Sequence, residues 1–288
     1  MPPPRLLVVE GNTAEARARH RSMGGTVTGE GYADLLARLL PGAVVDICLP
    51  ADPGANLPQR SGLEGYDGIA ITGSALNIYD GGPAIAPQIE LIRSALSAGT
   101  PIFGSCWGLQ VIAVAAGGSV RRNPKGREIG FARRIAVTQA GRGHAMYRGK
   151  APVFDALAVH LDEIETLPAG TVVLASNGMS DVQAAEVRVD GTVAWGVQYH
   201  PEYSCREMAA IVRRYGGRLI DEGLFTTPEA IEAFAADLET LDRDRGNRPL
   251  AWRYGVDAAV LDDRVRTAEI ANWIAHQVLP TRARRGRG

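Results

Sequence analysis

Short apolar runs alternate with amphipathic segments along the N-terminal part of the chain. Four mainly apolar runs have the length of buried strands, and they cover residues 6–9, 43–49, 68–72 and 101–103. Three segments carry apolar side chains at helical spacing, and they cover residues 32–40, 84–98 and 107–116. The polar, glycine-rich residues 12–31 are expected to form a long loop, flexible from Gly24 to Gly31. Strands that alternate with helices in this way predict a parallel sheet covered on both faces.

The pattern changes after Gly118, where predicted strands follow one another more closely. The apolar residues indicate strands at 129–137, 158–161, 172–175, 183–189 and 193–199, followed by a helix at about 205–222. We therefore expect one α/β domain over residues 1–222. Its sheet is expected to be doubly wound and mostly parallel, with helices on both faces.

Residues 223–288 are expected to form an appended helical segment. Apolar side chains recur at spacings of three and four between residues 230 and 241 and again between 260 and 278. Such faces must be covered in water. The flank of the α/β domain is the expected cover, and a homodimer contact is a second place for it. The arginine-rich end, residues 282–288, is expected to be mobile.

Composition and charge narrow the function classes. The chain has 288 residues, and its 31 basic and 32 acidic side chains nearly cancel, so no global field attracts nucleic acid. No apolar run approaches the ~18 residues of a membrane span, and no signal-peptide pattern precedes the first strand, so a cytoplasmic location is expected. The cysteines, Cys48, Cys106 and Cys205, and the five histidines show no pairing or metal-type spacing. We expect no disulfide framework, no metal and no cofactor.

The stretch around Cys106 resembles a nucleophile elbow. A predicted strand runs into Gly104-Ser105-Cys106-Trp107-Gly108 and then directly into a helix, a G-x-C-x-G pattern with cysteine in place of serine. The glycines leave room for a sharp turn that projects the sulfur above the sheet. The N-terminus of the following helix is expected to favour the thiolate. A buried structural cysteine is the alternative, and the two flanking glycines make it the weaker one.

A second polar group follows the last predicted strand. His200 precedes Pro201, which holds the histidine in an extended conformation, and Glu202 lies on the same side of such a segment. Glu202 can therefore orient the imidazole, as the third member of a catalytic triad does. A polar strand exit without function is the alternative. The position beyond the carboxyl end of a strand favours a site, because ligands of parallel α/β sheets bind there.

These motifs together resemble the class I glutamine amidotransferase family. The resemblance is carried by the motif at residues 104–110 and by the Tyr-His-Pro-Glu motif at residues 199–202. Residues 70–74 are similar to that family's oxyanion strand. Residues 117–128 and Leu167-Pro168 resemble the GMP-synthase-like branch of the family. The resemblance spans about residues 5–222 and leaves the helical extension uncovered.

The resemblance implies a reaction at the side-chain amide of glutamine. Cys106 attacks the amide, and backbone N–H groups of Gly73 and Trp107 hold the oxyanion. His200, assisted by Glu202, protonates the departing ammonia and then activates water, which hydrolyses a γ-glutamyl thioester.

Further contacts with glutamine are implied for a small set of residues. These are Gln110, Ser74, His160 and Leu161. Gln110 could equally be a helix surface residue. His160 and Leu161 match the family segment whose backbone binds the glutamine carboxylate, although Leu161 stands where small residues are commoner.

Three functions remain open at the level of sequence. The first is a glutaminase that delivers ammonia to an acceptor, expected on a partner synthetase because the sequence contains no S-G-G-x-D-S motif of an ATP pyrophosphatase. The second is a γ-glutamyl hydrolase or peptidase that acts alone on a substituted γ-glutamyl amide. The third is a non-enzymatic binding protein derived from the family, against which the intact Cys106, His200 and Glu202 argue.

Overall fold

The computed structural model describes residues 2–58 and 60–287 of the chain. The strands are β1 (Arg5–Val9), β2 (Val44–Cys48), β3 (Gly68–Ile71), β4 (Ile102–Ser105), β5 (Ser119–Arg122), β6 (Glu128–Val137), β7 (Val153–His160), β8 (Asp162–Thr166), β9 (Thr171–Ser176), β10 (Ala184–Val189) and β11 (Thr192–Val197). The helices up to the end of the predicted α/β domain are α1 (Ala14–Ser22), α2 (Thr28–Leu39), α3 (Arg60–Leu63), α4 (Ala86–Ser97), α5 (Trp107–Ala115), α6 (Gln139–Arg142) and α7 (Cys205–Asp221).

The C-terminal extension consists of further helices. These are α8 (Pro228–Arg243), α9 (Arg248–Tyr254), α10 (Ala258–Leu261), α11 (Asp263–Arg266), α12 (Ala268–Trp273), the π-helical turn η3 (Ile274–Val278) and α13 (Leu279–Arg284). Two short 3₁₀ turns, η1 (Ile78–Asp80) and η2 (Ala145–Tyr147), lie in loops of the α/β domain.

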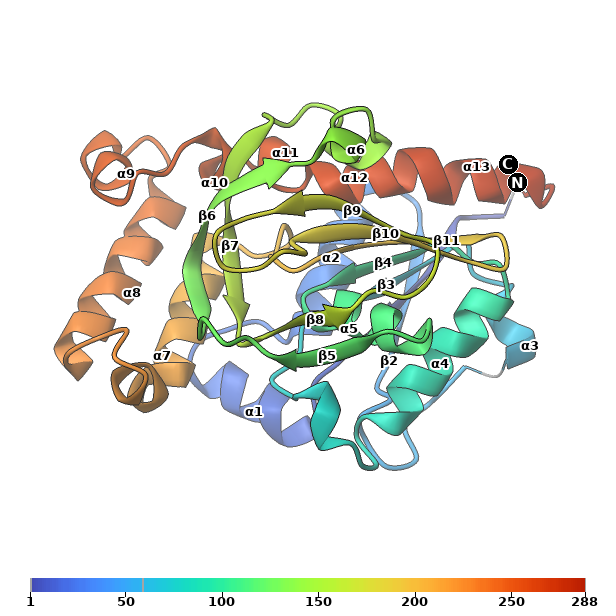
Figure 1. Ribbon diagram of the computed structural model, residues 1–288, viewed down its shortest axis with the longest axis horizontal. Helices are drawn as coiled ribbons and strands as arrows, with labels where there is room; N and C mark the ends of the chain where they lie inside the picture. The colour runs from blue at the N-terminus through green and yellow to red at the C-terminus, as the bar shows by residue number, and fades with distance from the viewer. Residues whose placement is uncertain (1, 59, 288) are drawn as a thin grey trace.

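Nine of the described strands form one sheet in the order β2-β1-β3-β4-β11-β10-β9-β6-β7 (Figure 1). The strands from β2 to β11 pair in parallel. From β11 onward the sheet continues through antiparallel pairs to β7, and β5 pairs with β8 in a separate antiparallel ribbon. The predicted α/β class is confirmed. The sheet is mixed because short connections join β9, β10 and β11, and such connections favour antiparallel neighbours.

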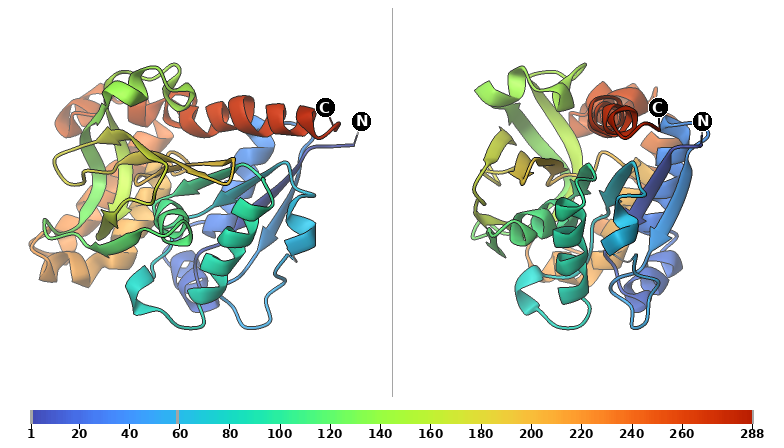
Figure 2. Two further views of the ribbon diagram at one scale, coloured as in Figure 1. Left: turned by 45° about the vertical axis from the view of Figure 1, so that its right-hand side comes forward. Right: turned by 90° about the vertical axis from the view of Figure 1, so that its right-hand side faces the viewer.

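Helices cover both faces of the parallel part of the sheet, as predicted. The apolar side chains of α4 and α5 share a core with one face. The side chains of α2, α12 and η3 share a core with the other face (Figure 2). Because both faces are covered, the carboxyl edge of the parallel strands is where loops and polar side chains collect.

Residues 12–31 differ from the predicted loop, since they contain α1 and the first turn of α2. Thr13 caps α1 by accepting a hydrogen bond from Ala16 N at 3.3 Å. The buried carboxylate of Glu10 accepts a hydrogen bond of 2.6 Å from Gly29 N in the first turn of α2, where negative charge is favoured. The loop prediction was wrong because these contacts offset the low helix propensity of glycine.

The last helices pack on the flank of the α/β domain. Ile270, Trp273, Ile274 and Val278 are buried against the sheet. Gly68 of β3 lets the extension approach closely, because a Cβ atom there would lie 2.7 Å from Val278 Cγ2 and 2.8 Å from the Trp273 ring. The apolar face of α8 instead packs against α7, where Ile231, Ala235, Leu238 and Leu241 are buried.

The arginine-rich end of the chain is docked rather than mobile as far as Arg287. Arg282 donates a 2.9 Å hydrogen bond to the buried carboxylate of Asp67, which Arg287 also contacts at 3.4 Å. Arg285 donates to Tyr66 O at 2.8 Å. Arg282 also donates hydrogen bonds to the backbone oxygens of Pro2 and Pro3, so the two ends of the chain lie side by side (Figures 1 and 2). The expectation of a mobile end was wrong because a buried carboxylate requires a counter-charge, which the sequence pattern does not reveal. No described helix is both long and apolar enough to cross a membrane.

Truncation of Trp273 tests how much the docked extension contributes to stability. Trp273 is fully buried, so Trp273→Ala should lower the free energy of unfolding by about 3–5 kcal/mol. Trp252 in α9 is 88% exposed, so Trp252→Ala serves as the matched control and should change stability little. Urea unfolding followed by circular dichroism measures both. Equal losses in the two variants would contradict the docking of η3 and α12 on the sheet.

Candidate active site

Cys106 lies at the turn between β4 and α5 in a strained conformation. Its backbone angles are φ 53° and ψ −102°, and such a conformation costs a non-glycine residue about 1–3 kcal/mol. A Cβ atom on Gly104 would lie 2.4 Å from the backbone of Gly108, and one on Gly108 would lie 2.6 Å from Ile71 O. Both positions therefore require glycine if α5 is to start this close to the sheet. The sharp turn predicted from the G-x-C-x-G motif is present.

The sulfur of Cys106 is buried among polar groups. It donates a hydrogen bond to Val159 O at 3.5 Å and accepts one from Gln198 Nε2 at 3.4 Å. Burial and, to a smaller extent, the negative charge of Glu202 raise the pKa of the thiol to about 12, although the backbone N–H of Trp107 lowers it. The backbone N–H at the start of α5 favours the thiolate, as expected, but desolvation of the buried sulfur outweighs this effect and keeps the pKa of the thiol high.

His200 and Glu202 follow β11, the strand next to β4. Val197 lies opposite Ser105 in a parallel register, so the chain leaves both strands at the same edge of the sheet. The Nδ1 atom of His200 lies 2.7 Å from Glu202 Oε1. The ring of Tyr203 stacks on the imidazole with a centroid distance of 4.0 Å. A carboxylate on Nδ1 and an aromatic ring on the face fix both the tautomer and the plane of the imidazole.

The other ring nitrogen of His200 faces the loop after β3. Nε2 is buried and has no hydrogen-bond partner within residues 2–58 and 60–287. A Cβ atom on Gly73 would lie 2.6 Å from His200 Cε1 and 3.4 Å from Nε2. A small cavity at His200 and another at Cys106 share Ser74 and Val159 in their walls. The fold thus brings the cysteine, the histidine and the predicted oxyanion segment to one place.

The loop that carries Gly73 is held by Asn12, a residue that the sequence analysis missed. Asn12 Nδ2 donates to Gly73 O at 3.2 Å, and its Oδ1 accepts from Ala75 N at 3.0 Å. Glu10 orients Asn12 in turn, because Glu10 Oε1 accepts from both its backbone and its side-chain nitrogen at 2.9 Å. Two polar residues directly after the first buried strand were the available signal, since the carboxyl ends of parallel strands meet at one edge.

The residues predicted to contact glutamine line the cavity at Cys106, which has a volume of about 30 Å³. They are Gln110, Ser74, His160 and Leu161. Gln110 is buried rather than on a helix surface, and its Nε2 donates to Asp162 O at 3.3 Å and to Gln198 Oε1 at 3.2 Å. The latter bond links Gln110 to the side chain that donates to Cys106.

Two of these side chains are engaged by the protein itself. His160 Nε2 lies 2.9 Å from Glu128 Oε2, and Ser74 Oγ donates to Gly11 O at 2.8 Å. Both side chains are therefore already hydrogen-bonded within the protein. Within the described chain, no three His, Cys, Asp or Glu side chains are grouped so as to hold a metal ion.

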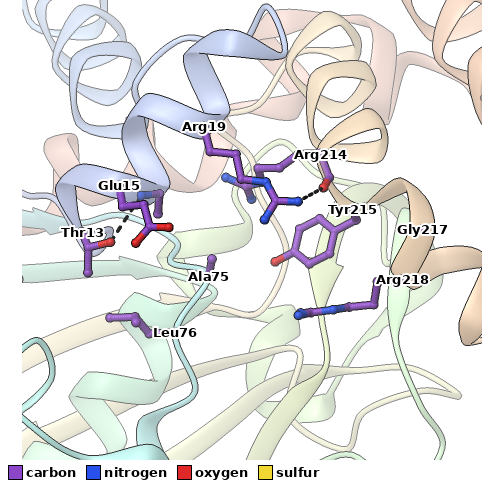
Figure 3. A pocket seen from close by; sticks show the side chains of 10 residues that line it. Thr13, Glu15, Arg19, Ala75, Leu76, Arg214, Tyr215, Gly217 and Arg218 are labelled. Carbon is purple, nitrogen blue, oxygen red and sulfur yellow. Dashed lines mark hydrogen bonds between the residues drawn. The ribbon is translucent and has the colours of Figure 1, made fainter.

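Helix α7 supplies further residues that the sequence analysis missed. Tyr215 and Arg218 line the cavity at Cys106 and also a larger neighbouring cavity of about 490 Å³ (Figure 3). Arg127 contacts the Tyr215 ring at 4.8 Å and forms two hydrogen bonds of 2.7 and 2.9 Å with Glu222. The positions of Arg218 and Tyr215 become evident only when α7 is packed across the mouth of the site.

A buried ion pair anchors the strand exit behind His200. Lys150 Nζ lies 2.7 Å from Glu269 Oε1, and both side chains are at most 1% exposed. The hydroxyl of Tyr199 donates to the same carboxylate oxygen at 2.7 Å. Burial and the charge of Glu269 raise the pKa of Tyr199 well above its usual value, so its hydroxyl remains a donor. Helix α12 thereby holds the residue that directly precedes His200.

Comparison with known proteins agrees with this geometry. The family described as glutamine amidotransferase class-I matches residues 44–215. A γ-glutamyl-L-1-hydroxyisopropylamide hydrolase from a Pseudomonas species is 36% identical over 286 residues, which are 98% of this chain and 95% of that protein. The glutamine-hydrolysing GMP synthase of Porphyromonas gingivalis strain W83 is 33% identical over 211 residues, which are 73% of this chain and 39% of that protein.

The fold has a counterpart among solved structures. A glutamine amidotransferase from Thermotoga maritima matches 96% of this chain and 98% of its own with a TM-score of 0.66, and at 19% identity it supports the fold alone. The match to the GMP synthase covers less of this chain than the match to the Pseudomonas hydrolase. The sequence motifs suggested the GMP-synthase-like branch, whereas the longer match is to the hydrolase. The non-enzymatic alternative is not supported. The chain belongs to the class I glutamine amidotransferase family and is a hydrolase of C–N amide bonds with a cysteine nucleophile.

Proposed function

We propose that the chain is a γ-glutamyl amide hydrolase that acts alone and releases glutamate and an amine from a substituted γ-glutamyl amide. The observation that carries this proposal is the similarity to the Pseudomonas hydrolase across 98% of the chain. A match of this extent includes most of residues 223–288, which lie outside the matched family region 44–215. A shared extension in addition to a shared domain favours a shared reaction type over ammonia transfer.

In the proposed mechanism Cys106 Sγ attacks the γ-carbonyl carbon and its proton passes to His200 Nε2. The backbone N–H groups of Gly73 and Trp107 hold the oxyanion. His200 returns the proton to the departing amine, which leaves a γ-glutamyl thioester on Cys106. Water then loses a proton to His200 and attacks the thioester; the C–S bond breaks, glutamate is released, and His200 returns the proton to Cys106 Sγ. Glu202 stabilises the positive imidazolium in both halves of the reaction.

The raised pKa of Cys106 has a consequence for this sequence of steps. A thiol with a pKa of about 12 is protonated at neutral pH. The nucleophile therefore forms when the proton moves to His200 during the attack, rather than standing as a thiolate in the free enzyme. The unpartnered, buried Nε2 atom of His200 supports this role, because nothing else in the described residues occupies it.

Glutamine hydrolysis with ammonia transfer to a partner synthetase is the second candidate function. The similarity to the P. gingivalis GMP synthase favours it, although that match covers 73% of this chain. Both functions use the same proposed triad, since glutamine is the γ-glutamyl amide with the smallest leaving group. They differ in the preferred amine and in the need for a partner.

A direct comparison of substrates separates the two functions. The purified chain should hydrolyse γ-glutamyl-L-1-hydroxyisopropylamide with a kcat/KM at least about tenfold above that for glutamine, because contacts with even a few extra carbon atoms are worth this much. Glutamate release measured by chromatography gives both constants. Faster turnover of glutamine, together with strong stimulation by a candidate synthetase, would favour ammonia transfer instead.

Substitutions test the assigned roles. Cys106→Ser should lower amide hydrolysis at least about 10³-fold, and His200→Ala should cost more than Glu202→Ala, because the imidazole moves protons and the carboxylate orients it. Cys205→Ser is the matched control, as Cys205 is buried at the start of α7 outside the cavities at Cys106 and His200. The electrophile diazo-oxo-norleucine should label Cys106 alone. A larger loss for Glu202→Ala, or labelling of Cys205, would contradict these roles.

The protonation state of Cys106 predicts how alkylation depends on pH. With a pKa of about 12, the thiolate fraction grows about tenfold per pH unit, so the iodoacetamide rate at Cys106 should rise about tenfold per unit from pH 7 to pH 9 without a plateau. Mass spectrometry of the peptide that contains Cys106 measures the rate. A plateau below pH 7 would instead indicate a thiolate in the free enzyme.

A further inference from the structure

The cavity of about 490 Å³ beside the candidate site is lined on one side by arginines. Arg19 of α1 and both Arg214 and Arg218 of α7 lie around Tyr215, while Glu15 lies beside Thr13 on the other side (Figure 3). The guanidinium groups of Arg214 and Arg218 are 5.2 and 5.8 Å from the centre of the Tyr215 ring. The ring holds these charges at the wall of the cavity without neutralising them.

None of these three arginines forms an ion pair in the described part of the chain. By contrast, Arg213, one residue before Arg214 on α7, forms ion pairs with both Glu232 and Glu239. Glu15 is the one carboxylate among the described residues that line the cavity, against three arginines. The cavity therefore carries an excess of positive charge, which favours an anion inside it.

The position of Arg214 indicates which part of a substrate the excess charge would meet. Arg214 lines both the large cavity and the small cavity at His200, where Tyr203 and Gly73 are also in the wall. The leaving nitrogen must lie on the His200 side, because that residue protonates it in the proposed mechanism. The cavity at His200 has a volume of about 10 Å³, so any substituent on the nitrogen must extend outward, past Tyr215 and toward Arg214.

We propose that Arg214, with Arg19, binds a carboxylate on the amine part of the substrate, so that the preferred substrates are γ-glutamyl amino acids. This inference rests on the proposed function and narrows its substrate class. A γ-glutamyl dipeptide and water give glutamate and a free amino acid. The carboxylate of that amino acid is two bonds away from the scissile nitrogen, and the half-buried Arg214 lies between the small cavity and the large one. Arginine suits this role because its planar fork binds carboxylates with two parallel hydrogen bonds.

Two substrates that differ at one group test the inference. γ-Glutamyl-L-alanine carries a carboxylate where γ-glutamyl-L-1-hydroxyisopropylamide carries a hydroxymethyl group. The wild-type chain should prefer the carboxylate form at least about tenfold in kcat/KM, and Arg214→Gln should remove most of this preference, because a charge-assisted hydrogen bond is worth that much. Arg206→Gln is the matched control, since Arg206 is an exposed residue of α7 outside the cavities described above. Its preference should equal that of the wild type.

Binding to an inactive variant separates this inference from the proposed function. In Cys106→Ala, calorimetry with the two intact amides should show the same preference for the carboxylate, weakened by added salt. Hydrolysis of both amides without a carboxylate preference, or an equal loss for both amides in Arg214→Gln, would overturn the inference alone. Carboxylate-dependent binding without hydrolysis of either amide by the wild type would support the inference and overturn the proposed function. Neither binding nor hydrolysis would overturn both.

Discussion

The candidate site depends on the close approach of α5 to strands β3 and β4. At Gly104 and Gly108 the helix and the strands are so close that a side chain at either position would overlap the backbone opposite. This contact forces Cys106 into a left-handed backbone conformation and directs its sulfur at the carboxyl edge of the sheet. The strain is sustained by the packing of the helix on both strands, whose apolar side chains are fully buried. A looser contact would let the turn relax and move the sulfur away from the other polar groups.

Around this point the structure uses buried charges to hold loops rather than to neutralise the site. Glu10 orients Asn12, which in turn holds the loop that carries Gly73. Glu269 and Lys150 hold Tyr199, which precedes His200. Each charge is paired or hydrogen-bonded, as burial requires. The loop that carries Gly73 and the segment that leads to His200 are therefore positioned by interactions that do not involve the sulfur of Cys106.

The C-terminal extension belongs to this positioning apparatus as well as to the hydrophobic core. Trp273 and Val278 fill the space above Gly68 of β3, while Glu269 in the same helical segment reaches the strand exit at Tyr199. Helix α8 supports α7 from behind, so the face of α7 that bears Arg214 and Arg218 is presented to the site. The extension thus contributes both to the stability of the fold and to the geometry of the candidate site and of the cavity lined by Arg19, Arg214 and Arg218.

The sequence by itself determined those features that depend on local chemistry. The glycines at positions 104 and 108 and the extended segment before Pro201 act over a few residues, so they predict the turn at Cys106 and the pairing of His200 with Glu202. The order of the parallel strands β1 to β4 and of the helices α2, α4 and α5 follows from hydrophobic periodicity in the same way, whereas α1 does not. Only the tertiary structure decided what depends on contacts between distant segments. The pKa of Cys106 is set by the groups that cover the sulfur, and the first-turn glycine of α2 is tolerated because Glu10 meets it from another element. Likewise, Arg19 and Arg214 are far apart in sequence and face one cavity only after α1 and α7 have packed together, because desolvation and charge depend on distance in space.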